Sequence, residues 1–289
     1  MTSKISIPVF DMTSLLPDAT ILIIGKRRSG KSVLLKDIFY HHQAIPQAVV
    51  ISGTESASPF FRDFIPDTFI YNKYNSEKIK KVINRQKLII NEARDKGLGN
   101  NGDGKTKENN VAIVFDDLQA DVSEWVNDQN IKDIFFNGRH YNIFFVLSLQ
   151  YMMGLKANLR SNIDYVFVFS ESSFKNKRKI WEDYFSFFPD FGHFCNVLDQ
   201  CTTDYGCLIV KTCGESSPSW YKASLHGSFK VGKDTMWKYH KNNYNKSHLM
   251  ENALSQKELL ELQQKYKNAK NLKVVVSKQG HVKTIDKVK

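Results

Sequence analysis

The chain has 289 residues and 42% hydrophobic content, enough for one large α/β domain or two smaller domains with a buried core. No window approaches the roughly 18 uninterrupted apolar residues of a membrane span, and the first ten residues lack a signal-peptide pattern, so a soluble intracellular protein is expected. The formal charge of +11 points to an acidic partner, with nucleic acid the first candidate and an anionic membrane the second.

The chain is predicted to begin with a lead-in, a strand and a helix. Residues 1–19 contain two prolines and show weak periodicity, which is typical of an extended segment. Residues 20–25 (TILIIG) form a short apolar run of the kind buried in a parallel sheet. Residues 32–42 carry apolar side chains at helical spacing, so the polar segment before them joins a strand to a helix.

This joining segment reads Gly-Lys-Arg-Arg-Ser-Gly-Lys-Ser and matches the pattern G-x-x-x-x-G-K-[ST]. In such a loop, backbone N–H groups curl around phosphate oxygens, and the following helix adds its positive end. We expect Lys31 to reach the terminal phosphates of ATP and Ser32 to supply a ligand to Mg²⁺. An ordinary strand-to-helix turn is the alternative. The expected nucleotide-binding residues are Gly25, Lys26, Arg27, Arg28, Ser29, Gly30, Lys31 and Ser32. Arg27 and Arg28 occupy variable positions of the pattern and have no expected catalytic role.

The next segments continue the alternation. Residues 47–54 predict a second strand, and residues 75–97 predict a helix that ends at Gly97, a common helix terminator. Residues 97–110 are rich in glycine and asparagine. This composition predicts a mobile surface loop that supplies neither core nor catalysis.

An apolar strand at residues 111–117 (VAIVFDD) ends in two aspartates. Because the carboxyl ends of parallel strands share one edge of the sheet, both carboxylates are expected beside the phosphate loop. We expect Asp116 to hold Mg²⁺ through water, alongside Ser32, and Asp117 to orient or polarise the attacking water. The alternative is that the two aspartates only cap a turn.

Residues 130–141 predict a helix, and residues 142–150 (NIFFVLSLQ) predict another apolar strand, which ends in Gln150. An amide at that strand end can sense the γ-phosphate and help to place the water. A solvated glutamine is the alternative. Residues 164–171 predict a further strand of the sheet.

Two arginines are candidates for an arginine finger, a guanidinium that neutralises transition-state charge in a neighbouring subunit. Arg139 lies on the helix before the Gln150 strand, and Arg160 lies in a polar connection just beyond it. Arg160 is favoured because a loop is easily presented to a partner. In the alternative, each is an ordinary surface arginine.

The C-terminal third is basic. Residues 173–188 predict a basic amphipathic helix closed by Pro189, and residues 205–212 predict the last core strand. Residues 255–268 predict a helix, and residues 273–285 predict a small hairpin. From Lys241 to Lys289 there are eleven lysines and four acidic residues. The candidates for a surface that binds DNA phosphates are the lysines after Lys230 and the cluster Lys175, Lys177, Arg178 and Lys179.

The four cysteines, Cys195, Cys201, Cys207 and Cys213, are spaced by six residues. This spacing matches no common zinc pattern, and the thiols are expected to be reduced and partly buried. The alternation of strands and helices predicts an α/β fold with a doubly wound, mostly parallel sheet. The expected divisions are a lead-in (1–19), a P-loop ATPase domain (20–228) and a basic C-terminal extension (229–289).

Four segments, in this order and at these separations, carry a family resemblance: GKRRSGKS, VAIVFDD, FFNGRHYNIFFVLSLQ and LRSNIDYVFVF. The chain resembles the genome-packaging ATPases of nucleocytoplasmic large DNA viruses, in the FtsK/HerA branch of P-loop ATPases. By position, Lys31 and Ser32 match the Walker A pair, Asp116 the Walker B aspartate, and Gln150 the polar sensor. Many members of the wider superfamily have glutamate where this chain has Asp117, which is shorter by one methylene.

The resemblance implies a RecA-like (ASCE) core, a homo-oligomeric ring, Mg²⁺-dependent ATP hydrolysis and translocation of double-stranded DNA into a preformed capsid. Capsid or portal vertex proteins would be partners. The protein would be virus-encoded and act at assembly sites in the host cytoplasm or in the virion.

Two other functions are compatible with the phosphate loop. A P-loop kinase for a nucleotide or small acceptor would also need an arginine-rich lid, and no clear lid segment is present. A nucleotide-gated assembly factor would bind ATP with little turnover. The catalytic pattern of Asp116, Asp117 and Gln150 argues against that reading.

Overall fold

The structure is a computed structural model that describes residues 6–119, 122–152, 154–214, 216–252, 264, 275–276 and 282–283. The chain divides into two compact units, Met1–Lys241 and Asn242–Lys289. The second unit contains an antiparallel pair of short strands, β9 (Val275–Val276) and β10 (Val282–Lys283). Among the helices that the structure describes, none is long and apolar enough to cross a membrane.

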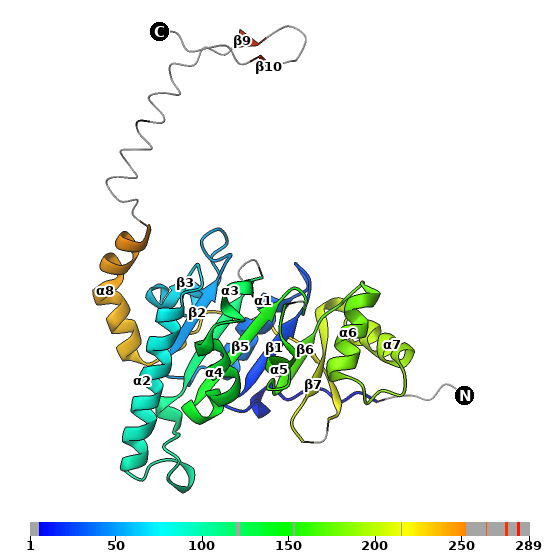
Figure 1. Cartoon of the computed structure of the whole chain (residues 1–289), viewed down its shortest axis with the longest axis horizontal. Helices are drawn as coiled ribbons and strands as arrows, with labels where there is room; N and C mark the ends of the chain where they lie inside the picture. Colours follow the sequence, from blue (N-terminus) through cyan, green and yellow to red (C-terminus); the bar gives the residue numbers. More distant parts are fainter. Residues whose placement is uncertain are drawn as a thin grey trace. The chain divides into compact units, whose positions relative to one another are not determined.

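The first unit is built on an eight-stranded sheet with the order β3-β2-β4-β5-β1-β6-β7-β8 (Figure 1). The first six strands in this order are parallel, and β7 and β8 add an antiparallel edge. The strands are β1 (Thr20–Ile24), β2 (Ala48–Ser52), β3 (Ile70–Tyr71), β4 (Val111–Asp116), β5 (Ile143–Leu149), β6 (Tyr165–Val168), β7 (Gly206–Lys211) and β8 (Pro218–Lys222).

Helices connect the strands. They are α1 (Lys31–His41), α2 (Ser76–Asp95), α3 (Val122–Trp125), α4 (Gln129–Asn137), α5 (Ala157–Arg160), α6 (Phe174–Tyr184), α7 (Phe191–Cys201) and α8 (Asp234–Asn252). Short 3₁₀ helices occur at Met12–Ser14, Phe61–Asp63, Asp67–Phe69, Asn100–Gly102, Lys107–Asn109, Gly138–Tyr141 and Thr203–Tyr205. Side chains of Asn75, Asp128, Ser173 and Asp190 accept hydrogen bonds at the starts of α2, α4, α6 and α7.

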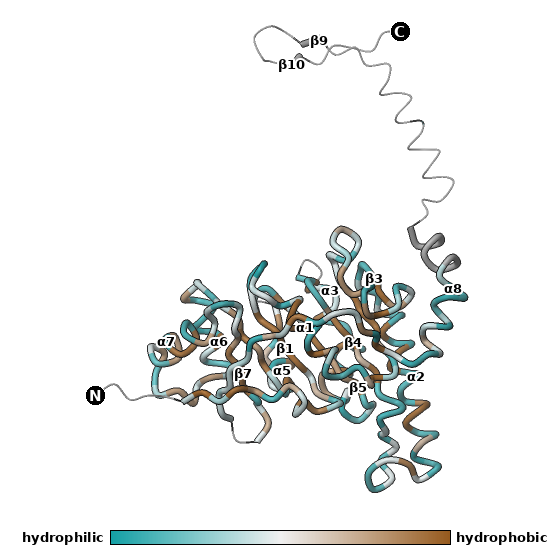
Figure 2. The backbone as a smooth tube through the Cα atoms, turned by 180° about the vertical axis from the view of Figure 1, so that it is seen from behind, coloured by the Kyte–Doolittle hydropathy of each residue, from teal (hydrophilic) through white to brown (hydrophobic). Residues whose placement is uncertain are grey.

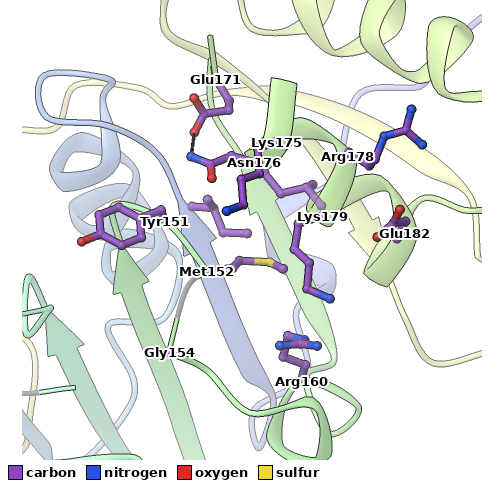
Figure 3. A pocket seen from close by; sticks show the side chains of 12 residues that line it. Tyr151, Met152, Gly154, Arg160, Glu171, Lys175, Asn176, Arg178, Lys179 and Glu182 are labelled. Carbon is purple, nitrogen blue, oxygen red and sulfur yellow. Dashed lines mark hydrogen bonds between the residues drawn. The ribbon is translucent and has the colours of Figure 1, made fainter. Parts of the chain in front are cut away.

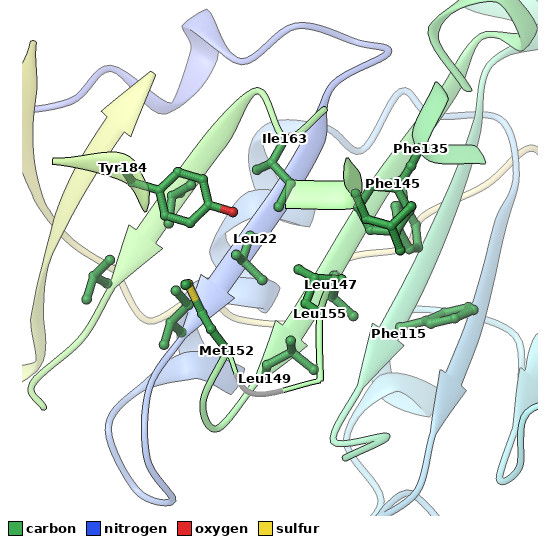
Figure 4. Close-up of a cluster of buried hydrophobic side chains, with 14 of the residues drawn as sticks. Leu22, Phe115, Phe135, Phe145, Leu147, Leu149, Met152, Leu155, Ile163 and Tyr184 are labelled. Atoms are coloured by element: carbon green, nitrogen blue, oxygen red, sulfur yellow. The ribbon is translucent and has the colours of Figure 1, made fainter. Parts of the chain in front are cut away.

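The sheet separates two hydrophobic cores, because successive strand side chains point to opposite faces. In β1, Leu22 and Ile24 join the core that also contains side chains of α2, α4, α5, α6 and α7. Figure 4 shows part of this core, with Leu22 of β1, Phe135 of α4 and Tyr184 of α6. Ile21 and Ile23 join the opposite core, which is covered by α1. Figure 2 shows the central strands largely in hydrophobic colours, whereas α2 alternates along its length. With both faces covered, the strands are continuous apolar runs.

The parallel register fixes which residues share an edge of the sheet. Ile24 of β1 lies beside Leu149 of β5, and Ser148 of β5 lies beside Asp116 of β4. The Gly25 N–H donates to the Leu149 carbonyl over 3.1 Å, so the phosphate-loop segment begins at the carboxyl end of β5. The edge that carries Gly25 therefore also carries the ends of β4 and β5.

The mostly parallel α/β sheet predicted from the sequence is confirmed. Several elements were not predicted, among them the edge strands β3 and β8 and the helices α7 and α8. The strand β8 begins with Pro218 and is only half-buried, so it lacks the apolar run of the central strands. Asp190, directly before α7, is a residue type that often caps a helix, and this was the available sequence signal. In the structure its carboxylate accepts a hydrogen bond from the His193 N–H over 2.8 Å.

The segment 97–110 differs from the predicted surface loop, because its last residues are built into the fold. Asn109 and Asn110 are buried. The Gln86 amide donates to the Asn109 carbonyl over 2.7 Å, and the Asn110 amide donates to the Asn142 carbonyl over 3.1 Å. These side-chain hydrogen bonds connect α2 to the buried end of the segment and that end to the residue before β5. Asparagine content alone does not distinguish such a network from a solvated loop.

The C-terminal predictions fall largely outside the described residues. In the helix predicted at 255–268, Gln264 is described and is helical. The pairing of β9 with β10 agrees with the hairpin predicted at 273–285, whose turn lies outside the description. The four cysteines are free thiols, with Cys201 and Cys207 buried, Cys195 half-buried and Cys213 exposed.

The core beneath the site is expected to tolerate little loss of volume. Leu147 in the middle of β5 is 1% exposed, and Leu147→Ala should reduce the free energy of unfolding by about 2–5 kcal/mol. The same change at Leu88, which is 64% exposed, should stay within about 0.5 kcal/mol. Urea unfolding of both variants checks this, and equal losses would contradict the assignment of Leu147 to the core.

Candidate functional site

The loop of residues 25–32 requires glycine at two positions. A Cβ at Gly25 would lie 2.8 Å from the Cβ of Phe169, and Gly30 has a left-handed backbone with φ of 107°. Gly30 occupies the cap position of α1, where no side-chain hydrogen bond is made. The first N–H groups of α1 therefore lack the kind of capping side chain that α2, α4, α6 and α7 have, and they can bind an anion.

The ammonium of Lys31 is folded into this loop. Its Nζ donates to the Gly25 carbonyl over 2.6 Å and to the Lys26 carbonyl over 2.9 Å. Burial lowers the pKa of Lys31, while the nearby charges of Asp116 and Asp117 act to raise it. Lys31 therefore lies close enough to both carboxylates to interact with them electrostatically.

Asp116 is buried at the end of β4. Its carboxylate accepts a hydrogen bond from the Ser52 hydroxyl over 3.4 Å. Burial raises the pKa of Asp116 above the ordinary value, and the opposing effects of Ser148, Lys31 and Ser52 do not cancel it. The fold therefore holds a carboxyl group where its ionised form is disfavoured.

Asp117 and Gln150 are in direct contact. The Gln150 Nε2 donates to Asp117 Oδ1 over 2.6 Å, which connects the end of β5 to the end of β4. Asp117 has a left-handed backbone with φ of 50°, unusual for a residue other than glycine. This turn directs the chain away from the strand immediately after the paired aspartates.

The predicted residues Lys31, Asp116, Asp117 and Gln150 are brought together at one edge of the sheet. Ser32 lies beside Lys31 in the first turn of α1 and is exposed to solvent. Ser29 contributes a buried hydroxyl that has no partner among the described residues. The polar groups at this edge are therefore one ammonium, two carboxylates, one amide and two hydroxyls.

A pocket of about 480 Å³ adjoins the loop. One wall consists of Arg28, Gly30, Lys31, Ser32 and Val33, and the other of Tyr205, Lys222, Ala223 and Leu225. Tyr205 is 63% exposed and Leu225 is 87% exposed. Sequence reasoning missed this second wall because it comes from the β7 and β8 region, nearly 200 residues away along the chain.

A second pocket, of about 440 Å³, is lined by side chains of α6 and of the segment after β5 (Figure 3). The cationic residues Arg160, Lys175, Arg178 and Lys179 line it, together with Glu171 and Glu182. Glu171 forms an ion pair with Lys26 over 2.9 Å and accepts from the Asn176 amide over 3.0 Å. Glu171 thereby links the phosphate-loop segment to α6, and its place at a strand end was the signal that could have found it.

Lys177 does not belong to this exposed basic surface, although the sequence placed it in the cluster. It is 7% exposed, and its ammonium pairs with Asp199 at 2.5 Å. On a helix, residues 175, 178 and 179 share one side while residue 177 points elsewhere. The surface candidates of this cluster are therefore Lys175, Arg178 and Lys179.

The two candidate arginines lie in different settings. Arg160 is the last residue of α5 and is not in a loop. Its guanidinium pairs with Asp183 at 3.1 Å and donates to the Leu155 carbonyl over 2.5 Å. Arg139 is exposed on the 3₁₀ helix before β5, at the edge of the sheet opposite the phosphate loop.

A protein-family model described as Poxvirus A32 protein matches residues 8–181. Uncharacterized protein L437 of Acanthamoeba polyphaga mimivirus is 31% identical over 248 residues, covering 84% of this chain and 86% of the relative. Uncharacterized protein 088R of Invertebrate iridescent virus 3 is 36% identical over 191 residues, covering 66% of this chain and 68% of the relative.

Two solved structures share the fold. The genome packaging NTPase B204 from Sulfolobus turreted icosahedral virus 2, in complex with ATP-gammaS, matches with a TM-score of 0.50 and 17% identity. The DNA-packaging ATPase B204 from Sulfolobus Turreted Icosahedral Virus matches with a TM-score of 0.51 and 18% identity. Each match covers 73% of this chain and all of the other. These likenesses confirm the predicted P-loop ATPase fold.

Burial of Asp116 has a consequence for stability. A folded-state pKa raised above the unfolded value means that the fold is favoured at low pH and loses this contribution as the pH rises through the folded pKa. Asp116→Asn removes the buried negative charge, so its Tm at pH 7 should exceed that of the unmodified protein.

The increase should shrink as the pH is lowered toward the ordinary range of an aspartate. Thermal unfolding measured from about pH 4 to about pH 8, a range that begins at the ordinary pKa of an aspartate, checks this. The matched control is Asp63→Asn, which changes an exposed aspartate. A Tm for Asp116→Asn at or below that of the unmodified protein at every pH would contradict the prediction.

Proposed function

The chain belongs to the poxvirus A32 protein family, as the resemblance in its sequence predicted, and we propose that it is an ATP-hydrolysing motor that moves double-stranded viral DNA into a capsid. The observation that carries the proposal is the gathering of Lys31, Asp116, Asp117 and Gln150 at one sheet edge in a member of this family. The relatives are viral proteins, which supports a virus-encoded protein.

Residues 25–32 fit the phosphates of ATP. Donors for phosphate oxygens are the uncapped N–H groups of α1, the Lys31 ammonium and the Ser29 hydroxyl, which has no partner within the described part of the chain. Binding of ATP-gammaS by the B204 protein of the same fold supports this role. The adjoining pocket would receive the base, with Tyr205 and Leu225 as exposed apolar surfaces against it.

Ser32 and Asp116 fit a hard cation. A hydroxyl and a carboxylate are oxygen ligands of the kind that Mg²⁺ prefers, and the proposed roles are direct coordination by Ser32 and contact through water by Asp116. When bound, the ion would neutralise charge that develops on the phosphate oxygens. A cation would also offset the disfavoured burial of the ionised Asp116.

The contact between Gln150 and Asp117 would position the attacking water. Asp117 Oδ1 accepts from the Gln150 amide, which fixes the orientation of both side chains. The remaining carboxylate lone pairs can accept a proton of the water, and the amide oxygen of Gln150 can accept another. The shorter Asp117, in place of glutamate, would thus act with Gln150 as a unit.

Double-stranded DNA would be held through its phosphates without reading of sequence. The proposed contacts are Lys175, Arg178 and Lys179, together with the basic extension at residues 229–289, much of which lies outside the description. A homo-oligomeric ring, capsid or portal partners and cytoplasmic assembly sites complete the proposal. The proposed divisions of the chain remain 1–19, 20–228 and 229–289.

Replacement of Lys31 is expected to abolish ATP turnover, since the ammonium that faces the phosphates is lost. Lys31→Ala should leave no measurable phosphate release, whereas Lys36→Ala, on the same helix, should retain nearly full activity. Long double-stranded DNA should stimulate the unmodified protein. Phosphate release with and without DNA checks both points.

Each competing function has its own outcome in that assay. Phosphorylation of a small acceptor with no response to DNA would overturn the motor in favour of a P-loop kinase. Tight ATP binding without turnover, with or without DNA, would favour a nucleotide-gated assembly factor. Full activity of Lys31→Ala would overturn the nucleotide site itself.

The arginine finger is proposed to be Arg139 rather than Arg160, because Arg160 is held within its own subunit by Asp183. Arg139→Ala should reduce turnover on the order of 1,000-fold, the lower range for such fingers. Mixed rings of Arg139→Ala and Lys31→Ala subunits should recover activity, because an intact Lys31 site can then face an intact Arg139.

The matched experiment uses Arg160→Ala subunits in place of Arg139→Ala. Arg160→Ala is expected to lower Tm through loss of the Asp183 ion pair while turnover per folded ring is kept. Full turnover by Arg139→Ala would exclude Arg139 as the finger, and recovery only in mixtures that contain Arg160→Ala would assign the finger to Arg160.

A further inference from the structure

A second cluster of side chains that could bind a metal ion lies toward the C-terminal end of α1, away from the phosphate loop. Asp37 is fully buried on this helix. His41 follows it by one helical turn, and His226 belongs to the segment that follows β8. The three residues offer one carboxylate oxygen and two imidazole nitrogens, and these atoms all lie within 4.8 Å of one another.

The two oxygens of Asp37 have different surroundings. Oδ2 accepts from the Tyr221 hydroxyl over 2.7 Å and from the Ser224 N–H over 3.2 Å. Oδ1 faces the Nε2 atoms of both histidines, with His226 in hydrogen-bond contact and His41 at 3.5 Å. Hydrogen bonds to one oxygen thus orient the carboxylate and direct the other at two nitrogens of the same type.

The charge of Asp37 needs compensation. Burying a carboxylate is costly unless it is paired, and its ion-pair partners among the described residues are His41 and His226. A neutral imidazole can donate one hydrogen bond to Oδ1 but adds no positive charge. A divalent cation that replaced the hydrogen bond between Oδ1 and the His226 Nε2 would supply that charge, and it could bond to Oδ1 and to both Nε2 atoms once His226 had moved away from Oδ1.

We propose that Asp37, His41 and His226 bind one Zn²⁺ ion. Imidazole nitrogen and carboxylate oxygen are both ordinary zinc ligands, and two ligands spaced by four residues on a helix lie on one face. The histidine side chains are 28% and 13% exposed, so the ion can enter from solvent and a water can take the fourth position. Tyr221 and Ser224 hold the carboxylate from behind.

The zinc site joins two walls of the nucleotide pocket. Helix α1 begins at Lys31, and Leu225, which immediately precedes His226, lines the other wall. The ring of Tyr40 stacks on His226 with centroids 3.6 Å apart, which adds a second contact between the same elements. A bound ion would hold the segment 223–226 against α1. Zinc binding itself does not depend on the proposed motor function.

The test is metal binding by the full chain after treatment with a chelator. Titration with Co²⁺ should give visible absorption bands of a site with nitrogen and oxygen ligands at one equivalent, and Zn²⁺ should displace it. The intense band of sulfur coordination should be absent, which separates this site from the four cysteines. Thermal unfolding should show a higher Tm with Zn²⁺.

Three variants locate the site. His41→Ala and His226→Ala should each weaken Zn²⁺ binding by more than roughly 100-fold, and Tyr221→Phe, which removes a hydrogen bond to Asp37, by roughly 10-fold. His193→Ala is the matched control, because His193 also pairs with an aspartate, Asp190, at 2.7 Å, but the described residues form no three-membered cluster of metal ligands there. It should bind Zn²⁺ like the unmodified protein.

The proposal is overturned if the unmodified chain binds no Zn²⁺ at micromolar concentration, or if His41→Ala and His226→Ala bind it as tightly as His193→Ala. Circular dichroism checks that each variant is folded. If a histidine variant does not fold, the Zn²⁺ affinity of Tyr221→Phe decides between the two outcomes. ATP turnover is not needed for any of these readouts, so loss of the motor function and loss of the zinc site are distinguishable.

Discussion

The parallel register of β4, β5 and β1 is the constraint on which the site depends. Pairing of Asp116 with Ser148 and of Ile24 with Leu149 brings the ends of three strands to one edge. The residues that follow these positions are then neighbours, although up to 125 positions separate them in the chain. If one of these three strands shifted its pairing by one residue, every side chain of that strand would point to the other face of the sheet.

Two ionisable groups at this edge, Lys31 and Asp116, lie where burial disfavours their charged forms. Burial lowers the pKa of Lys31 and raises that of Asp116, so the fold disfavours the charged form of both groups. Their mutual attraction offsets only part of this cost. Such opposed shifts are typical of sites that bind a charged ligand, because phosphate and a cation supply the missing partners.

Helix α1 forms one wall of the pocket at its first turn and holds the segment of the other wall further along. Its first turn is uncapped and available to an anion, and its last turns carry Asp37 and His41. Asp37 accepts hydrogen bonds from Tyr221 and Ser224, which lie on either side of the pocket-lining residues 222–223. The two walls of the pocket are therefore joined through one buried carboxylate. Movement of the segment 223–226 would require that these hydrogen bonds break.

Much of the fold could be predicted from local sequence, because buried parallel strands are continuous apolar runs and α1 has helical periodicity. The position of Lys31, Asp116, Asp117 and Gln150 at one edge of the sheet could be predicted as well, since the motif and the strand ends locate them. The elements β8 and α7 were not predicted, for different reasons. The half-buried strand β8 begins with a proline and lacks a continuous apolar run, so its strand signal is weak. The helix α7 was missed although its buried residues Phe194, Val197, Leu198 and Cys201 recur at helical spacing.

The sequence by itself determined the class of sheet, the phosphate loop and the polar residues at the strand ends, because these depend on the order and type of neighbouring residues. Only the tertiary structure decided that Gln150 contacts Asp117, that Arg160 is held by Asp183, and that Lys177 is buried. It also brought Asp37 together with His226, 189 positions along the chain. These contacts depend on which elements pack together, and no local pattern of residues encodes that choice.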